Sequence, residues 1–267
     1  MSLDKFREMK RRGEKIVALT AYDAPTARRL QDCGVDIILV GDSVGVNILG
    51  YAHEREVTLA DMAHHVAAAR RGAPRAHIMG DLPYATYESP QQALASAAVL
   101  REAGADSVKF EGAQVDIAAA LTGAGVAVCC HLGLESQHQT EKRRQGRTAA
   151  AALKLLADAK ALDAAGQAML VLELLPREVA AAITTAVTAP TIGIGSGGET
   201  DGQVLVVNDM AGITPREFRH NRRYGALGAA LTDAVAAYSR DVRSGAFPAA
   251  EHGFAMDPAE ATLFARG

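Results

Sequence analysis

Short apolar runs rich in valine, isoleucine and leucine alternate along the chain with alanine-rich segments whose apolar residues recur at helical spacing. A continuous apolar run is typical of a strand that is covered on both faces, as parallel strands are. Eight runs have this character: residues 15–22 (KIVALTAY), 35–41 (VDIILVG), 76–83 (AHIMGDLP), 107–112 (SVKFEG), 126–134 (VAVCCHLGL), 168–176 (AMLVLELLP), 190–197 (PTIGIGSG) and 203–210 (QVLVVNDM). Eight strand-then-helix units predict an α/β fold, a (β/α)8 TIM barrel.

The clearest helix signal lies at residues 89–105. Ser89 suits the N-cap, Pro90 suits the first turn, and the helix is expected to stop at Gly104. No linker divides the chain, so residues 1–267 are predicted to form a single barrel domain with a more polar tail at about 248–267. Further helices are expected in residues 59–72, 148–166, 177–189 and 215–245.

Composition and charge narrow the class of partner. The 267 residues are 49% apolar, and their net charge of −3 is spread along the chain, so no nucleic-acid or membrane partner is expected. No apolar run approaches the ~20 residues of a membrane span, and the basic start does not resemble a signal peptide. Three cysteines form no disulfide framework, which favours a cytoplasmic location.

Polar side chains follow the strands where the chemistry of such a barrel is expected, at the C-terminal strand ends. Lys109 and Glu111 are two residues apart in an extended segment, so both point to one face. Burying two charges is costly unless they are paired or bind something, which favours a binding site over scattered loop acids. In chain order the strand ends carry Asp42 with Ser43, Asp81, Lys109 with Glu111, His131, Glu173, Ser196 and Asp209.

Some members of this set have simpler explanations. Asp42 and Asp81 stand in turn-like contexts, where an aspartate often hydrogen-bonds its own backbone. Glu173 is harder to explain in this way, because apolar residues flank it in a core strand.

Two further patterns are interpreted as structural. Cys129, Cys130 and His131 lack a zinc-binding spacing, and neighbours in a strand face opposite ways, so structural cysteines are expected. The glycine-rich stretch 193–198 lacks the position and the acidic partner of a dinucleotide fingerprint, and is interpreted as a tight turn or a close backbone approach to a ligand.

Three carboxylates without a thiolate or histidine cluster favour a hard cation such as Mg²⁺. Such an ion, chelating a 2-oxo acid, would stabilise the enolate that forms beside the ketone. A separate carboxylate in an apolar strand suits the role of general base, and a lysine can neutralise the substrate carboxylate. The residues alone therefore predict metal-assisted enolisation of a 2-oxo acid.

The order and spacing of ten motifs resemble those of the ketopantoate hydroxymethyltransferase family, also called the 3-methyl-2-oxobutanoate hydroxymethyltransferase family. The motifs lie between about residues 15 and 214: LTAYDAPTARRL, LVGDSVGVNILG, VTLADMAHHVAAARRGAP, GDLPYATYESPQQAL, AGADSVKFEG, CHLGLESQ, QGR, LVLELLP, IGIGSG and TDGQVLV. The resemblance implies an enzyme of pantothenate biosynthesis. Such an enzyme passes a hydroxymethyl group from 5,10-methylenetetrahydrofolate to 3-methyl-2-oxobutanoate, giving 2-dehydropantoate.

The resemblance also implies a role for each matching residue. Asp42 and Asp81 are expected to bind magnesium, and Glu111 to bind it directly or through water. Asp42, Ser43, Asp81 and Lys109 are expected to bind the substrate. Glu173 is expected to be the catalytic base that abstracts the proton. It further implies a homo-oligomer, because the family forms large rings such as decamers.

Two departures from the family pattern fall near the expected site. The segment ESQHQTEKRR, residues 135–144, is about three residues shorter than usual and lacks a Gly-Gly-Tyr element. Asn208-Asp209 stands where the family usually has His-Asp. Both departures leave the metal, substrate and base residues intact, so we expect enolisation to be robust and transfer from folate to be comparatively weak.

Besides a diverged second copy of the enzyme with weakened use of folate, two alternative functions remain open from the sequence. One is a related magnesium-dependent lyase or mutase of the isocitrate lyase or phosphoenolpyruvate mutase type, although the cysteine-bearing loop typical of those enzymes is not found. The other is a barrel retained as a binding or assembly protein, which the intact acidic set disfavours.

Overall fold

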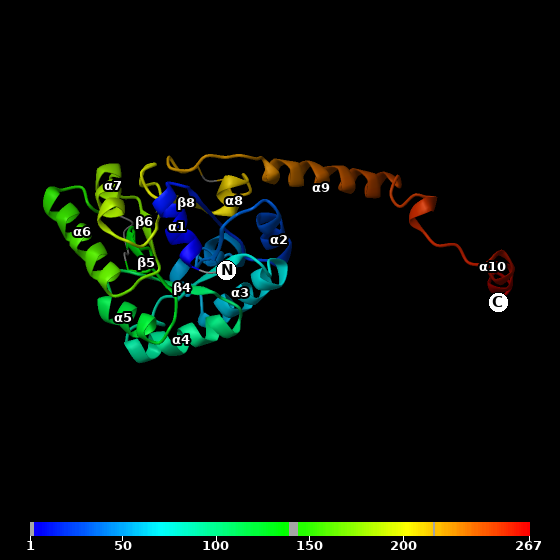
Figure 1. Cartoon of the computed structure of the whole chain (residues 1–267). Helices are drawn as coiled ribbons and strands as arrows, with labels where there is room; N and C mark the ends of the chain where they lie inside the picture. Colours follow the sequence, from blue (N-terminus) through cyan, green and yellow to red (C-terminus); the bar gives the residue numbers. More distant parts are fainter. Residues whose placement is uncertain (1–2, 139–143, 216) are drawn as a thin grey trace.

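The computed structural model describes residues 3–138, 144–215 and 217–267. Its centre is a closed barrel of eight parallel strands in chain order, each paired with the next and the last with the first (Figure 1). The predicted (β/α)8 TIM barrel is therefore confirmed. The strands are β1 Ile16–Thr20, β2 Ile37–Val40, β3 His77–Asp81, β4 Ser107–Glu111, β5 Val128–Gly133, β6 Met169–Glu173, β7 Thr191–Ile194 and β8 Gly202–Leu205.

Helices cover most of the outside of the barrel. The predicted start and stop of α4 are confirmed, because the Ser89 side chain accepts a hydrogen bond from the backbone nitrogen of Gln92 and Gly104 follows the helix with a φ of +113°. The α-helices are α1 Asp4–Arg12, α2 Ala24–Asp32, α3 Leu59–Gly72, α4 Pro90–Glu102, α5 Val115–Gly123, α6 Ala149–Ala164, α7 Arg177–Ala186, α8 Val207–Met210, α9 Leu227–Ser244 and α10 Pro258–Phe264. Short helical turns span Gly45–Leu49, Glu54–Glu56 and Ala250–His252.

Two expectations near the end of the barrel are wrong. The last strand ends at Leu205, so Asn208 and Asp209 lie on the short helix α8 and not on a strand. The helix expected over 215–245 begins only at Leu227. The apolar run continues past Leu205, so it does not show where the hydrogen bonds between strands end. The helical spacing likewise begins before the helix does.

The core has two layers, as expected for strands that are covered on both faces. Alternate strand residues fill the barrel interior, and the others pack outward against the helices. Cys129 belongs to the inner layer and Cys130 to the outer layer, which confirms the expectation that they face opposite ways.

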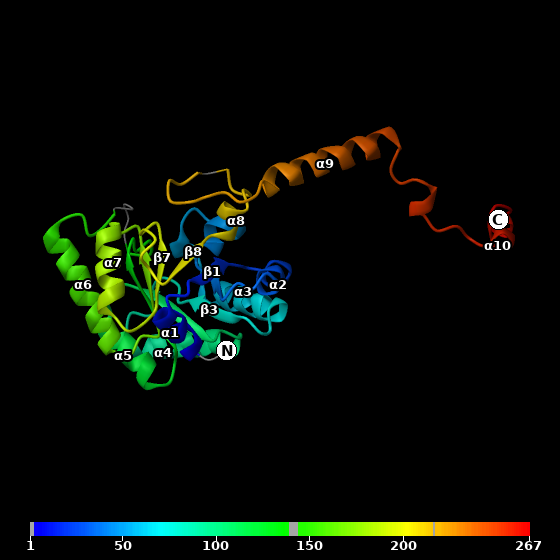
Figure 2. The same ribbon diagram turned by 45° about the horizontal axis from the view of Figure 1, so that its top comes forward.

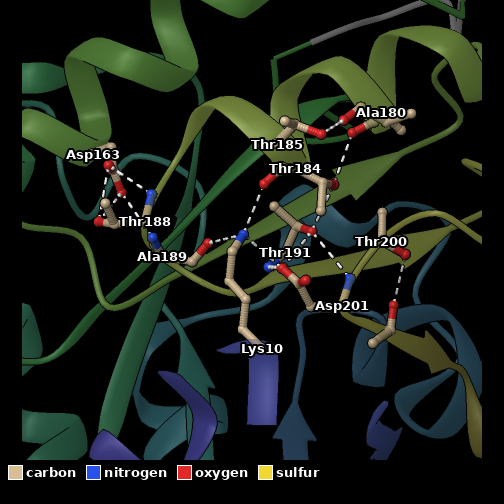
Figure 3. Close-up of polar contacts among 12 residues, drawn as sticks. Lys10, Asp163, Ala180, Thr184, Thr185, Thr188, Ala189, Thr191, Thr200 and Asp201 are labelled. Carbon is tan, nitrogen blue, oxygen red and sulfur yellow. Dashed lines mark hydrogen bonds and ion pairs between the residues drawn. The ribbon is translucent and has the colours of Figure 1, made fainter. Parts of the chain in front are cut away.

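Helix α1 closes the N-terminal end of the barrel. Phe6 is fully buried with the interior residues, and its ring meets the His77 ring edge to face at 5.3 Å. Lys10 donates to the backbone oxygens of Thr184 and Ala189 at 2.8 and 3.2 Å and pairs with Asp201 at 2.9 Å (Figure 3). These contacts join the first helix to a part of the chain more than 170 residues away.

In the described part of the chain, the outer faces of β1 and β8 have less helical cover than the other strands, although Leu19 of β1 packs against the outer layer of the core. Val17, which points outward from β1, is 48% exposed, whereas Ile38 and Val108 on other strands are fully buried. Gln203 on β8 is also exposed, and Leu205 is half-buried. The helix expected in this place, α8, spans only four residues.

The chain leaves the barrel after α8. Helix α9 projects from the barrel as an arm, and α10 lies farther out along it (Figures 1 and 2). No residue of α9 or α10 is buried. Residues 248–267 lie at the end of this arm. Within the described part of the chain, no helix is long and apolar enough to cross a membrane.

Candidate active site

A cavity of about 700 Å³ opens at the C-terminal ends of the strands. Strand ends from around the barrel contribute its polar lining, and apolar residues such as Leu39 and Val171 line its inner wall. All six residues assigned from the sequence line this one cavity: Asp42, Ser43, Asp81, Lys109, Glu111 and Glu173.

Asp42, Asp81 and Lys109 form a buried charged cluster. The ammonium nitrogen of Lys109 lies 2.8 Å from Oδ2 of Asp81, and that oxygen also accepts a hydrogen bond from the backbone nitrogen of Asp42 at 3.3 Å. Burial, followed by the charge of Asp81, raises the pKa of Asp42 to about 8. Burial opposes the charged form of Lys109, but the nearby carboxylates outweigh it and raise the pKa of this amine. The cluster therefore has more carboxylates than cations to balance them.

Glu111, His131 and Glu173 form a row across three neighbouring strands. The His131 ring nitrogens lie 3.5 Å from Oε1 of Glu111 and 3.2 Å from Oε2 of Glu173. Burial opposes protonation of the ring, yet the two glutamates raise the pKa of His131 to about 9. Burial likewise disfavours the Glu111 carboxylate, but His131 and Lys109 lower its pKa to about 2. An imidazolium between two carboxylates is the arrangement these shifts favour.

Glu173 is the most accessible of these carboxylates, with a side chain 24% exposed at the cavity. Two backbone features beside Glu173 restrict which residues can stand there. A Cβ on Gly133 would lie 2.1 Å from the backbone oxygen of Glu173, so glycine is needed where β5 and β6 meet. Leu174 has a φ of +52°, a conformation that costs a side-chain-bearing residue about 1 kcal/mol and that often occurs at functional sites.

Ser43 lies at the rim of the cluster. Its hydroxyl is 2.8 Å from the hydroxyl of Tyr22, which belongs to the segment that follows β1. Gly41 makes room here, because a Cβ at this position would lie 3.1 Å from the Ser43 hydroxyl oxygen and 3.3 Å from Oδ2 of Asp81.

Not every residue noted at a strand end faces the cavity. The Ser196 hydroxyl donates to the backbone oxygen of Leu172 and accepts from the backbone nitrogen of Leu175, so it ties β7 to β6. Asp209 lines the cavity, whereas Asn208 does not. Residues 139–143 of the shortened segment lie outside the described residues, and Arg144 lines the cavity.

The carboxylates differ in how they could hold a cation. Oδ1 of Asp81 is buried and has no hydrogen-bond partner among the described residues, and the backbone nitrogen of Asp42 donates to the other oxygen of the same carboxylate. Glu111 instead turns toward His131 and the loop after β5, where it accepts hydrogen bonds from the Ser136 hydroxyl and the Gln137 backbone nitrogen. Among the described residues, no group of three or more histidine, cysteine or acidic side chains encloses an ion position. Asp42 and Asp81 are thus the pair available to a cation.

Sequence reasoning missed the roles of His131 and Gln137. The sequence gives His131 no role because no zinc-binding spacing surrounds it, but its position two residues after Cys129 places it on the inner face of β5. Gln137 belongs to a loop, and no spacing rule connects it with Asp42, 95 residues earlier, whose carboxylate it contacts.

A closed (β/α)8 barrel with a charged cavity of this kind at its C-terminal end is the architecture of an enzyme. Comparison with known proteins gives the family. The family model described as ketopantoate hydroxymethyltransferase matches residues 1–250. The chain belongs to this family, and it is a transferase.

Named relatives agree with this assignment. The chain is 48% identical over 261 residues to the 3-methyl-2-oxobutanoate hydroxymethyltransferase of Chloroflexus aurantiacus, a match that covers 95% of this chain and 92% of the relative. It is 44% identical over 260 residues to the enzyme of the same name from Thiobacillus denitrificans, covering 95% and 99%.

Solved structures show the same fold at much lower identity. A phosphoenolpyruvate phosphomutase from Streptomyces platensis subsp. rosaceus superimposes with a TM-score of 0.64 at 12% identity, covering 99% of this chain and 94% of that one. A 2,3-dimethylmalate lyase, described as a member of the PEP mutase/isocitrate lyase superfamily, gives 0.60 at 16% identity, covering 97% and 92%. These similarities concern the fold alone.

Proposed function

We propose that this chain transfers a hydroxymethyl group from 5,10-methylenetetrahydrofolate to 3-methyl-2-oxobutanoate, giving 2-dehydropantoate, with Mg²⁺ as its cofactor. The observation that carries the proposal is one cavity that contains a lysine, a pair of buried aspartates and a separate, accessible glutamate, Glu173. The cavity belongs to a chain whose relatives bear the name of this activity.

The residues fit a magnesium ion. Among the described residues, Oδ1 of Asp81 is a buried oxygen without a hydrogen-bond partner, and the cluster around Asp42 has more carboxyl groups than cations. Mg²⁺ is commonly held by one or two carboxylates, with water and substrate oxygens completing its shell. Asp42 and Asp81 would hold the ion, and Glu111 would face it through water. When bound, the ion supplies positive charge that draws electrons from the keto group and makes the proton on carbon 3 more acidic.

Each side chain then has a separate role toward the 2-oxo acid. Lys109 neutralises the substrate carboxylate, and the Ser43 hydroxyl donates a hydrogen bond to the substrate. Glu173 accepts the proton from carbon 3. Water adds across one carbon–nitrogen bond of the folate methylene and supplies the hydroxyl oxygen. The carbon–hydrogen electron pair then forms the new carbon–carbon bond as the second carbon–nitrogen bond breaks, and that nitrogen takes up the proton from Glu173, releasing tetrahydrofolate. His131 holds Glu173 in place from the other side, since its ring lies 3.2 Å from the carboxylate.

The folate docks at the outer part of the cavity. Residues from the segments after β5 and after β8 line the cavity, among them Arg144, Asp209, Phe218 and His220, and we expect the folate to contact them. The rings of Phe218 and His220 stack with centroids 5.5 Å apart. Both departures from the family pattern lie in these segments, so we expect them to affect the folate half of the reaction.

Two measurements on the same protein test this function. Deuterium exchange at carbon 3 of 3-methyl-2-oxobutanoate reports proton removal, and product formation with 5,10-methylenetetrahydrofolate reports transfer. We expect robust exchange, weaker transfer, and growth of a pantothenate-requiring host that lacks this enzyme. Absence of both exchange and growth rescue would refute the function. Exchange without any transfer would favour the lyase or mutase alternative.

We further propose that the chain forms a homo-oligomer in which α9 of one copy covers the bare β1–β8 face of another. Two unpartnered surfaces of one chain support this. Large apolar side chains of α9, at Leu227, Leu231, Val235, Tyr238 and Val242, recur every three or four residues and are 45–65% exposed. Among the described residues, the helix that directly follows β8 has only four residues, so the outer face of β1 and β8 has no helix of regular length where one would pack in a regular barrel. The apolar side of α9 could therefore cover the exposed outer face of β1 and β8.

A further inference from the structure

Gln137 is a fully buried side chain in the loop after β5, and every polar group of its amide has a partner. Its amide nitrogen donates to Oδ2 of Asp42 at 2.8 Å and to the backbone oxygen of Leu82 at 3.1 Å. Its amide oxygen accepts a hydrogen bond from the Tyr87 hydroxyl.

Donor and acceptor accounting gives this network a direction. Both amide hydrogens of Gln137 are used, and its oxygen can only accept, so the single hydrogen of the Tyr87 hydroxyl must go to Gln137. The Tyr87 oxygen then accepts from the ring nitrogen of His138, 2.9 Å away, which therefore carries the proton. The chain of donors runs from the exposed His138 inward through Tyr87 and Gln137 to Asp42.

The direction matters because an amide can be turned by 180°. In the reversed orientation the amide oxygen of Gln137 would face the backbone oxygen of Leu82, which can only accept, and two acceptors would repel each other in a buried place. The observed orientation also gives the amide oxygen a donor, the Tyr87 hydroxyl. The ring of Tyr87 is itself held by packing against Phe110, with centroids 5.6 Å apart.

The same residue also restrains a second carboxylate. The backbone nitrogen of Gln137 donates to Oε2 of Glu111 at 2.8 Å. Gln137 thus contacts an acid that follows β2 and another at the end of β4. The side chains of both acids are fixed from one point in a loop.

We propose that Gln137, oriented by Tyr87, is a positioning residue that holds the Asp42 carboxylate in place for the cation and the 2-oxo acid. With Oδ2 occupied by the amide, the other carboxylate oxygen of Asp42 is left for the cation, and Oδ1 of Asp81 has no hydrogen-bond partner in the described part of the chain. This inference rests on the proposed function, in which these two aspartates bind Mg²⁺. Partners that orient metal ligands in this way are commonly worth about 10- to 100-fold in metal affinity.

The test measures Mn²⁺ binding to the full-length protein by electron paramagnetic resonance, with Mn²⁺ replacing Mg²⁺. We expect Q137L to weaken binding by about 10- to 100-fold. Y87F, which keeps the ring packing and removes only the hydroxyl, should weaken it less but in the same direction. D81N should remove most binding. These measurements need no catalytic turnover.

Gln167 offers a matched control. It is also a buried glutamine, 1% exposed, but its amide has no hydrogen-bond partner among the described residues and it precedes β6 at the opposite end of the barrel. Q167L should bind Mn²⁺ as the wild type does. Thermal unfolding without metal shows whether each variant is folded.

A second readout separates positioning from general damage. In the carbon-3 exchange assay, Q137L and Y87F should raise the KM for 3-methyl-2-oxobutanoate and leave the rate at saturating metal and substrate within a few-fold of wild type. Mn²⁺ affinity unchanged in folded Q137L and Y87F would overturn the inference and leave the proposed function intact. Failure of the wild type to bind Mn²⁺ would instead refute the metal site itself.

Discussion

At the scale of single residues, Glu173 is the carboxylate whose removal should stop proton transfer. E173Q keeps the shape of the side chain and removes the base, so carbon-3 exchange and overall turnover should both fall by ~10²- to 10⁴-fold. Glu135 provides a control, because it is another acid near the site whose pKa burial raises to about 7 and to which no role is assigned. E135Q should stay within a few-fold of wild type in the same assay. Normal exchange in E173Q would mean that a different group takes the proton.

His77 gives a prediction about stability at low pH. It is fully buried, and burial lowers its pKa from an ordinary value of 6.5 to about 4. Below pH 6.5 the His77 ring becomes protonated in the unfolded chain but stays neutral in the folded chain. The free energy of unfolding therefore falls as the pH drops toward 4. Between pH 7 and pH 5 this loss amounts to about 2 kcal/mol.

The substitution H77Q removes this titration and keeps a polar partner for the Ser107 hydroxyl, which lies 2.8 Å from the ring. Urea unfolding at pH 7 and pH 5 should show a larger loss of stability in the wild type than in H77Q. Equal losses in the two proteins would show that His77 is not buried as the neutral form.

The sequence predicted which residues line the cavity better than it predicted how they interact. Strand periodicity places Asp81, Lys109 and Glu111 on inward positions, because a period of two holds for every strand. The His131 bridge between Glu111 and Glu173 depends on how neighbouring strands are registered, with Glu111 level with His131 and Gly133 level with Glu173. A single sequence does not contain that register, and the assigned roles themselves stay predictions.

At the scale of elements, helix α1 was not predicted as part of the barrel. Lys10 of this helix contacts two backbone oxygens and an aspartate that are distant in the chain, and no local sequence pattern predicts such contacts. Apolar runs, by contrast, located all eight strands, since continuous burial on two faces leaves a strong local signal. The end of β8 and the start of α9 are predicted wrongly, because the apolar run continues past Leu205 and the expected helical segment begins well before Leu227.

The α1 contact gives a prediction of its own. K10M should destabilise the fold by about 2 kcal/mol, because it removes charged hydrogen bonds to two backbone oxygens and to Asp201. Lys5 lies on the same helix and pairs with Asp36, but it is 43% exposed, so K5M should cost less than about 1 kcal/mol. Urea denaturation of both variants compares them directly. A K10M variant as stable as K5M would show that the network in Figure 3 contributes little to stability.

At the scale of the whole molecule, the exposed apolar side of the α9 arm raises the question of which surface covers it. The single-domain assignment, the cytoplasmic location and the size of the oligomer stay predictions. An 18-residue helix spans about 27 Å, enough to cross the face of a small barrel. An exposed apolar stripe of this length is costly in water and is typical of an interface.

The last prediction therefore concerns assembly. Charges placed on the stripe, in L231E/V235E, should prevent α9 from packing on another copy and shift the protein toward smaller species. A229E/A236E adds the same charge to the opposite side of the same helix, because these positions lie about half a turn away from the stripe, and it should leave assembly unchanged. Sedimentation velocity of wild type and both variants measures the outcome. A complementary substitution on the barrel, V17E, should act like the first variant, since Val17 lies on the face that α9 is proposed to cover. If L231E/V235E dissociates the protein and V17E does not, then α9 packs on some other surface of the second copy. If all variants match the wild type, α9 does not form the interface.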